Sequence, residues 1–321
     1  MQIKGVITKG VGGLYTVRPD IDSKEAYLCR ARGIFRHESV SPTVGDRVTV
    51  LLGGDVAEKG ETGSLERRKK NDPKEIDGVI DSIDERKNLL IRPPMANLDV
   101  IFAIIPTKQP MPDLFLVDKL IAIAEHADIV PAVIITKCEL DPEAAKNTAE
   151  IYERVGYNVF EVSSVTGEGT DRLSAYIDSL GKGAVTAFAG ASGAGKSTLL
   201  NKLYPSLSLV TGALSRKTER GRQTTRHVEL FDAGGLYVAD TPGFSLLDFE
   251  RFDFFSCEAL PFTFKEFDPY HGKCKYTKCS HTCEDGCAVL RAVNEGIIPK
   301  TRHESYVNLY KSLKNKHPWD K

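Results

Sequence analysis

Residues 190–198, GASGAGKST, have the types and spacing of a phosphate-binding loop. Gly190, Gly195, Lys196 and Ser197 fill the four defined positions of GxxxxGK(S/T), between an apolar run and a helix-like run. In such a loop, backbone N–H groups surround the phosphates, the lysine reaches the β and γ oxygens, and the hydroxyl holds Mg²⁺. The alternative is a glycine-rich turn that matches the motif by chance, but such a turn would not need to lie between a strand and a helix. We expect a nucleoside triphosphate to bind Gly190, Ala191, Ser192, Gly193, Ala194, Gly195, Lys196, Ser197 and Thr198.

Two loops earlier in the chain have the residue types of guanine recognition. The loop at 136–139, TKCE, resembles the NKxD motif of GTPases, in which the acidic side chain accepts hydrogen bonds from guanine N1 and N2. The loop at 163–167 resembles the one whose backbone N–H, here that of Ser164, meets guanine O6. Either loop alone is a common strand end, but adenine lacks this donor pattern, and together they favour GTP. The expected base-binding residues are Thr136, Lys137, Glu139, Ser163 and Ser164.

Two segments after the phosphate loop have the features of GTPase switches. In GRQTT, residues 221–225, Thr225 is preferred over Thr224 as the residue that closes on Mg²⁺ and the γ-phosphate. In DTPG, residues 240–243, Asp240 is expected to hold Mg²⁺ through water and the Gly243 N–H to bind the γ-phosphate. The expected magnesium residues are therefore Ser197, Thr225 and Asp240, and the expected catalytic residues are Lys196, Gln223 and Thr225.

A third set of residues has the spacing of a metal site. Three thiols and an imidazole follow one another as Cys-x4-Cys-x-His-x5-Cys, and such a set suits a closed tetrahedral structural zinc. Free thiols in a loop are the alternative. Cys283 and His271 are spare candidates that could replace one ligand. The expected ligands of one Zn²⁺ are Cys274, Cys279, His281 and Cys287.

The elements that must position these residues alternate between strand and helix from residue 100 to residue 203. Expected strands at 100–105, 130–135, 158–162 and 184–189 are separated by helices, two of which begin after the capping residues Asp113 and Asp141. Such alternation predicts a parallel sheet covered by helices on both faces, with ligands bound at the carboxyl ends of the strands. All the nucleotide loops are expected at that edge.

The first ninety residues predict a small barrel instead. Five short strands at 3–7, 14–17, 26–31, 47–52 and 78–83 fit an OB-type fold, which often binds nucleic acid. Basic residues at 30–37 and 67–70 favour RNA contact over a merely solvated face. Pro93-Pro94 marks a boundary. The predicted domains are 1–92, an OB-fold RNA-binding domain; 93–247, an α/β P-loop GTPase domain; and 248–321, a mostly helical zinc-binding domain.

The composition limits the function classes further. The chain has 321 residues, 41% of them hydrophobic, and a net charge of −1, so only local basic patches could bind RNA. Its apolar runs are too short to cross a bilayer, and no signal peptide is expected. We expect a cytoplasmic monomer with no membrane partner. Because the base loops precede the phosphate loop and the switches follow it, the expected GTPase is circularly permuted, with residues after 243 leading into the zinc module.

These features together resemble one bacterial family, the ribosome small-subunit-dependent GTPases, RsgA. The resemblance rests on CRARG at 29–33, PTVGD at 42–46, RPP at 92–94, the permuted order and the cysteine–histidine spacing. It implies hydrolysis of GTP to GDP, stimulated by the small ribosomal subunit during its late maturation, with the barrel and zinc domains on ribosomal RNA. The alternative is a nucleotide-gated RNA-binding assembly factor that uses hydrolysis only for release. A phosphotransferase would have no use for the guanine-type loops.

Three positions depart from the pattern of related GTPases. Glu139 stands where the family usually has aspartate, which lengthens the arm that reads guanine. Gln223 stands where the family usually has histidine, and glutamine can also orient water. Phe244 occupies the place of the catalytic glutamine of Ras-like enzymes, and an apolar ring cannot do that work. We expect slow intrinsic hydrolysis, with Gln223 positioned productively only on the partner.

Overall fold

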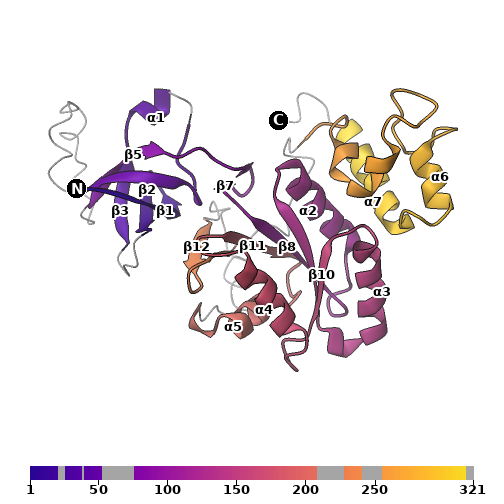
Figure 1. Cartoon of the computed structure of the whole chain (residues 1–321), viewed down its shortest axis with the longest axis horizontal. Helices are drawn as coiled ribbons and strands as arrows, with labels where there is room; N and C mark the ends of the chain where they lie inside the picture. The colour runs from indigo at the N-terminus through magenta and orange to yellow at the C-terminus, as the bar shows by residue number, and fades with distance from the viewer. Residues whose placement is uncertain (21–25, 38–39, 53–75, 208–227, 241–254, 316–321) are drawn as a thin grey trace, which may run out of the picture.

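The computed structural model describes residues 1–20, 26–37, 40–52, 76–207, 228–240 and 255–315. Three bodies follow one another along the chain: a β-barrel, a central α/β sheet and a helical carboxyl-terminal module (Figure 1). The predicted fold class is confirmed in each of them. No helix among the described residues is long and apolar enough to cross a membrane.

The amino-terminal body is a closed five-stranded barrel. The order β1-β2-β3-β5-β4 returns to β1, because β4 pairs with both β5 and β1, and β3 and β5 run parallel. Alternate apolar residues such as Val6, Val50 and Ile80 point inward and are almost completely buried. The elements are β1 (Gln2–Val11), β2 (Leu14–Pro19), β3 (Tyr27–Ala31), α1 (Ile34–His37), β4 (Arg47–Leu52) and β5 (Gly78–Ile83).

A short hairpin joins the barrel to the central sheet. Its strands are β6 (Leu89–Leu90) and β7 (Met95–Ala96), and Pro93-Pro94 lies in the connection between them. Asn97, with a φ of 58°, donates from Nδ2 to the Gly45 carbonyl at 2.9 Å and accepts from the Lys87 N–H at 2.9 Å. The junction is therefore a hydrogen-bonded element packed against the barrel.

The central sheet has the order β10-β9-β8-β11-β13-β12, and β12 alone runs antiparallel to its neighbour. Apolar residues that alternate along the strands form two cores, one beneath α2 and α3 and the other beneath α4 and α5. The strands are β8 (Val100–Pro106), β9 (Val130–Thr136), β10 (Asn158–Val162), β11 (Val185–Gly190), β12 (Glu229–Asp232) and β13 (Tyr237–Asp240). The helices are α2 (Leu114–His126), η2 (Cys138–Leu140), α3 (Pro142–Glu153), α4 (Thr170–Ser179), α5 (Lys196–Leu203) and η3 (Pro205–Leu207).

Two helix starts agree with their sequence signals. Asp113 accepts a hydrogen bond from the Leu116 N–H, and Asp141 accepts one from the Ala144 N–H, each at 3.0 Å. Both aspartates cap the free N–H groups of a first turn, and Pro142 occupies the first position of α3, where no N–H is needed. Local capping chemistry thus fixes where α2 and α3 begin.

The barrel and the central sheet are joined into one eleven-stranded sheet. Strand β1 pairs with β12 at Lys9 and Glu229, whose side chains form an ion pair at 2.6 Å. Arg18 of β2 and Asp232 of β12 form a second ion pair at 2.5 Å. This connection has no counterpart in the sequence prediction.

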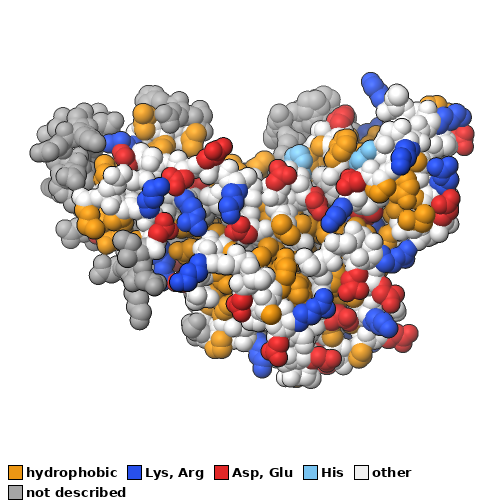
Figure 2. All heavy atoms as spheres, viewed as in Figure 1, with side chains coloured by type: hydrophobic (Ala, Val, Ile, Leu, Met, Phe, Trp, Pro, Cys, Tyr) orange, Lys and Arg blue, Asp and Glu red, His pale blue; other side chains and the backbone are white. Residues whose placement is uncertain are grey.

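The carboxyl-terminal module packs on the α2 and α3 face of the central sheet, with α7 beside α2 (Figure 1). Its elements are η5 (Leu260–Thr263), η6 (Lys265–Tyr270), α6 (Ala288–Asn294) and α7 (Lys300–Lys314). On the face drawn in Figure 2, Lys and Arg side chains are interspersed with Asp and Glu side chains. This face therefore shows no large patch of basic side chains alone among the described residues.

Candidate functional site

The loop between β11 and α5 has the backbone of a phosphate-binding loop. Gly190 ends β11, and a side chain there would collide with the Ile104 carbonyl oxygen of the neighbouring strand. Gly193 and Gly195 have φ angles of 77° and 90°, which favour glycine. Lys196 begins α5, so the first free N–H groups of that helix point toward the loop. The predicted strand, loop and helix are all present.

The loop that follows β9 lies directly against the phosphate loop. The Thr136 hydroxyl donates a hydrogen bond to the Ala194 carbonyl at 2.5 Å. The Lys137 ammonium donates to the Gly193 carbonyl at 2.8 Å and also to the Gln109 carbonyl. Lys137 has a φ of 60°, the left-handed conformation that turns the chain into η2. These contacts join segments that lie far apart in the sequence.

The side chain of Glu139 has a buried oxygen atom that could accept a hydrogen bond from a ligand. It lies in η2, and within the part of the chain that the structure describes its buried Oε2 atom has no hydrogen-bond partner. A buried carboxylate oxygen without a donor is costly, so such an atom indicates a ligand group or water. The two N–H donors on the N1 and N2 edge of guanine fit this requirement.

The loop after β10 is the neighbour of the loop after β9, because Val162 pairs with Thr136 in the parallel sheet. Ser163 is fully buried; its hydroxyl accepts from the Thr166 N–H at 3.1 Å and its carbonyl accepts from the Gly167 N–H at 2.8 Å. Ser163 thus shapes a tight turn that presents the partly exposed Ser164. The two base loops predicted from the sequence lie side by side.

The structure places the switch residues only in part. Gln223, Thr225 and Gly243 lie outside the described residues, as does the connection from residue 243 into the zinc module. The backbone of Asp240 ends β13, opposite Phe188, two residues before the phosphate loop begins. The end of β13 therefore reaches the same edge of the sheet as the phosphate loop.

One neighbour of the phosphate loop was absent from the sequence prediction. The segment 107–113 follows β8 and carries Gln109, whose carbonyl accepts from Lys137. Pro110 lies beside Gly193, where a side chain on the glycine would come within 3.6 Å of the Pro110 Cδ atom. The only sequence signal for this segment was its position after a buried strand of the parallel sheet.

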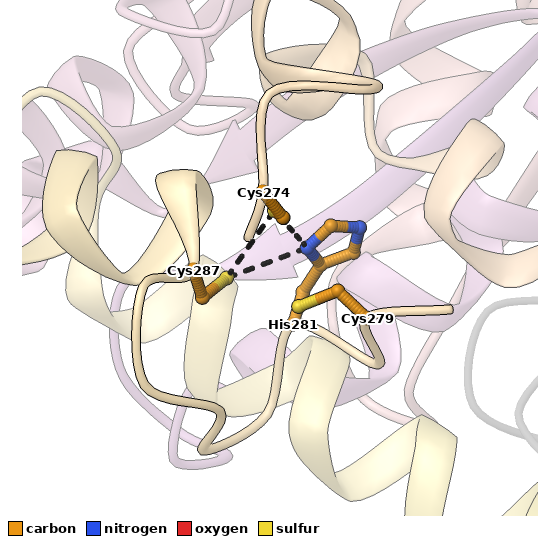
Figure 3. A group of neighbouring side chains, drawn as sticks. All are labelled: Cys274, Cys279, His281 and Cys287. Atoms are coloured by element: carbon orange, nitrogen blue, oxygen red, sulfur yellow. Dashed lines mark hydrogen bonds between the residues drawn. The ribbon is translucent and has the colours of Figure 1, made fainter. Parts of the chain in front are cut away.

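The predicted metal ligands converge in the carboxyl-terminal module. The ligand atoms of Cys274, Cys279, His281 and Cys287 all lie within 4.8 Å of one another (Figure 3). The Cys274 Sγ atom lies 3.9 Å from the Cys287 Sγ and 3.6 Å from the His281 Nδ1. A tetrahedron with Zn–S bonds of about 2.3 Å has edges of about 3.8 Å, so the set fits zinc. Cys283 is exposed and lies outside this group.

Backbone N–H groups bind the sulfur atoms of two of the four ligands. The Cys274 Sγ accepts from the Ala288 N–H at 3.3 Å, and the Cys287 Sγ accepts from the Leu290 N–H at 3.5 Å. Burial raises the pKa of the Cys279 thiol to about 12. Binding of a metal would therefore have to displace a proton, and the affinity should rise with pH.

The ligand loop is also fastened to α7. His303 contacts the His281 carbonyl at 2.8 Å through Nε2, and the Tyr306 hydroxyl donates to the Ser280 carbonyl at 2.7 Å. These bonds fix the loop in which His281 has a φ of 58°. Helix α7 is thus the support of the candidate zinc site.

The strand order, with base loops before the phosphate loop on one edge of a parallel sheet, defines a circularly permuted GTPase fold. Known proteins agree. The RsgA GTPase family model matches residues 83–250, and the RsgA N-terminal domain model matches residues 4–56. The chain belongs to the RsgA GTPase family, and GTP hydrolysis, with its nucleotide and Mg²⁺, is the activity of that family.

Relatives cover almost the whole chain. A small ribosomal subunit biogenesis GTPase RsgA of Ruminiclostridium cellulolyticum is 40% identical over 313 residues, which cover 97% of this chain and 94% of the relative. YjeQ from Thermotoga maritima has a crystal structure with a TM-score of 0.77 and 31% identity, covering 99% of this chain and all of the other. YloQ, a circularly permuted GTPase, has a TM-score of 0.73 and 33% identity, covering 99% and 97%.

Proposed function

We propose that the chain hydrolyses GTP to GDP and phosphate while it acts in the late maturation of the small ribosomal subunit, which stimulates the reaction. The observation that carries guanine recognition is the buried, unpartnered Oε2 atom of Glu139. It belongs to a loop that two hydrogen bonds fasten to the phosphate loop, through Thr136 and Lys137. These hydrogen bonds connect the proposed base site to the proposed phosphate site. The role in the subunit is supported by the names of relatives, small ribosomal subunit biogenesis GTPases.

The nucleotide is held along the edge formed by β8, β9, β10 and β11. Residues 190–198 bind the phosphates, Thr136, Lys137, Glu139, Ser163 and Ser164 bind the base, and Gly243 contacts the γ-phosphate. Ser197, Thr225 and Asp240 hold Mg²⁺, which offsets the charge of the phosphates when it is bound. Lys196 stabilises charge that develops on the γ-phosphate, and Gln223 orients the attacking water.

The flanking domains bind ribosomal RNA in this proposal. The barrel has a cavity of about 410 Å³ whose lining includes Arg30 and Arg32, and guanidinium groups suit RNA phosphates. Arg32 also forms an ion pair with Asp81. The zinc module carries Lys273, Lys275 and Lys278 around its metal ligands. We propose domain bounds of 1–92, 93–247 and 248–321, one structural Zn²⁺, and a cytoplasmic monomer.

The decisive measurement is the turnover of GTP and ATP with and without purified small ribosomal subunits. We expect subunits to stimulate GTP hydrolysis strongly and ATP hydrolysis negligibly, and Lys196→Ala to abolish both rates. Equal use of ATP, or the absence of stimulation, would contradict the proposal. A non-hydrolysable GTP analogue distinguishes this proposal from the alternative, an assembly factor that uses hydrolysis only for release. Such a factor would complete subunit maturation with the analogue but would stay bound to the subunit.

A further inference from the structure

A buried arginine links the zinc module to the GTPase domain. Arg302 of α7 is 1% exposed and donates from one guanidinium nitrogen to the Oδ1 of Asp118 in α2 at 2.7 Å. Its other nitrogens donate to both carboxylate oxygens of Glu266 in η6, at 2.7 and 3.2 Å. Two acidic groups therefore share one cation, and each comes from a different domain.

Aromatic rings enclose this pair. The Arg302 guanidinium lies over the ring of Phe264 at 4.6 Å from its centroid, and the rings of Tyr152 and Tyr157 lie within 5.9 Å. The Tyr152 hydroxyl donates to the same Asp118 oxygen at 3.1 Å. Burial opposes the charge of Arg302, but Asp118 and Glu266 hold its pKa well above the usual value. Burial raises the pKa of Asp118, and the charge of Arg302 opposes that rise.

Asp118 lies in the second turn of α2, and the start of that helix leads to the nucleotide site. Segment 107–113 runs from the end of β8 to the Asp113 cap. The Thr107 N–H and hydroxyl both donate to the Thr136 carbonyl, at 2.9 and 3.0 Å. The Gln109 carbonyl accepts from Lys137, which also binds Gly193. A displacement of α2 would therefore disturb both the base loop and the phosphate loop.

From these contacts we infer that Asp118 and Arg302 are positioning residues for the nucleotide site, because their ion pair fixes α2 and with it segment 107–113. The zinc module thereby supports nucleotide binding without touching the nucleotide. The inference rests on the proposed function in one respect, since it requires GDP to bind at residues 190–198. The route through α2 lies entirely within the described residues.

Asp118→Asn and Glu266→Gln form a matched pair of variants. Each removes one negative charge from the same buried cation and keeps the shape of the side chain, but Asp118 alone belongs to the GTPase domain. In the full chain we expect Asp118→Asn to weaken GDP binding about three- to ten-fold and Glu266→Gln to change it less than about two-fold, as for residues that act through coupled contacts. Hydrogen exchange at 107–113 should accelerate in Asp118→Asn alone, and the zinc content should be unchanged in both variants.

Three outcomes separate the possibilities. Equal effects of the two variants on GDP affinity would make the pair merely structural and overturn the inference. If the wild-type chain fails to bind GDP, the proposed function fails instead.

If Asp118→Asn does not fold, the wild-type chain still provides a test, because binding effects are reciprocal. GDP should then slow hydrogen exchange at 114–118 and 300–306, as well as in the nucleotide loops themselves. Protection confined to the nucleotide loops would refute the inference.

Discussion

The hydroxyl of Thr136 donates to the carbonyl of Ala194 at 2.5 Å, across 58 positions of sequence. Both residues are almost completely buried, at 1% exposure each. The bond connects the first residue of the base loop to the phosphate loop, in a chain in which these loops occur in permuted order. In the proposed site, this bond and the contact of Lys137 with the Gly193 carbonyl therefore couple recognition of the base to recognition of the phosphates.

Removal of this hydroxyl should weaken nucleotide binding. In Thr136→Val the Ala194 carbonyl loses its donor, and we expect GDP affinity to fall by about 1 kcal/mol, the net value of a typical hydrogen bond. Thr148→Val is the matched control, because Thr148 donates to the Ala144 carbonyl at 2.9 Å in α3, away from the loops. Fluorescent GDP titrations compare the two. A loss of the same size in the control would show that the effect is general destabilisation.

Gly190→Ala should disrupt both the sheet and the site. The added methyl group would meet the Ile104 carbonyl in β8, and relief of that overlap would displace the start of the phosphate loop. Overpacking of this kind costs about 1–3 kcal/mol, which urea unfolding would measure. Gly10→Ala in β1 is the control, since its methyl group would meet only the Tyr15 side chain, at 3.3 Å. If Gly190→Ala were as stable as the wild type and bound GDP equally well, the overlap with the Ile104 carbonyl would not be the reason for a glycine at position 190.

The zinc site predicts a clear difference between two neighbouring cysteines. Cys279→Ser should reduce bound zinc from one ion per chain to almost none, because a hydroxyl is a poor substitute for a thiolate. Cys283→Ser should keep the zinc, because Cys283 is exposed and outside the ligand group. Metal analysis of the purified variants measures both. Zinc loss in Cys283→Ser alone would mean that the ligand set is wrong.

Cys138 gives a pH-dependent probe of the base loop. Burial raises the pKa of its thiol to about 11, so at neutral pH almost all of it is protonated and unreactive. Its alkylation should accelerate about ten-fold per pH unit below that pKa, because only the thiolate reacts.

Exposed Cys283 should react first, and Cys283→Ser should remove the fast phase. GDP should protect Cys138, which lies between Lys137 and Glu139. Peptide mass spectrometry measures the labels, and fast, GDP-insensitive labelling of Cys138 at neutral pH would contradict this prediction.

Local signals in the sequence were sufficient for most of the fold. Alternating residues located the barrel strands, and the caps at Asp113 and Asp141 located two helices, because these features depend on near neighbours. Strand β12 was not predicted, since four residues carry little pattern and its position depends on pairing with β13 and β1. Likewise, the metal ligands followed from spacing, but the contact between Arg302 and Asp118 joins residues 184 positions apart and has no local signature.

The pairing of β1 with β12 also covers part of one edge of the central sheet. In an isolated central sheet, β12 would be an edge strand with unpaired N–H and C=O groups, which invite pairing between molecules. In the whole chain the barrel covers part of that edge at Lys9, and the charges of Lys9 and Arg18 compensate Glu229 and Asp232. We therefore expect a fragment that begins after the barrel to self-associate more readily than the full chain.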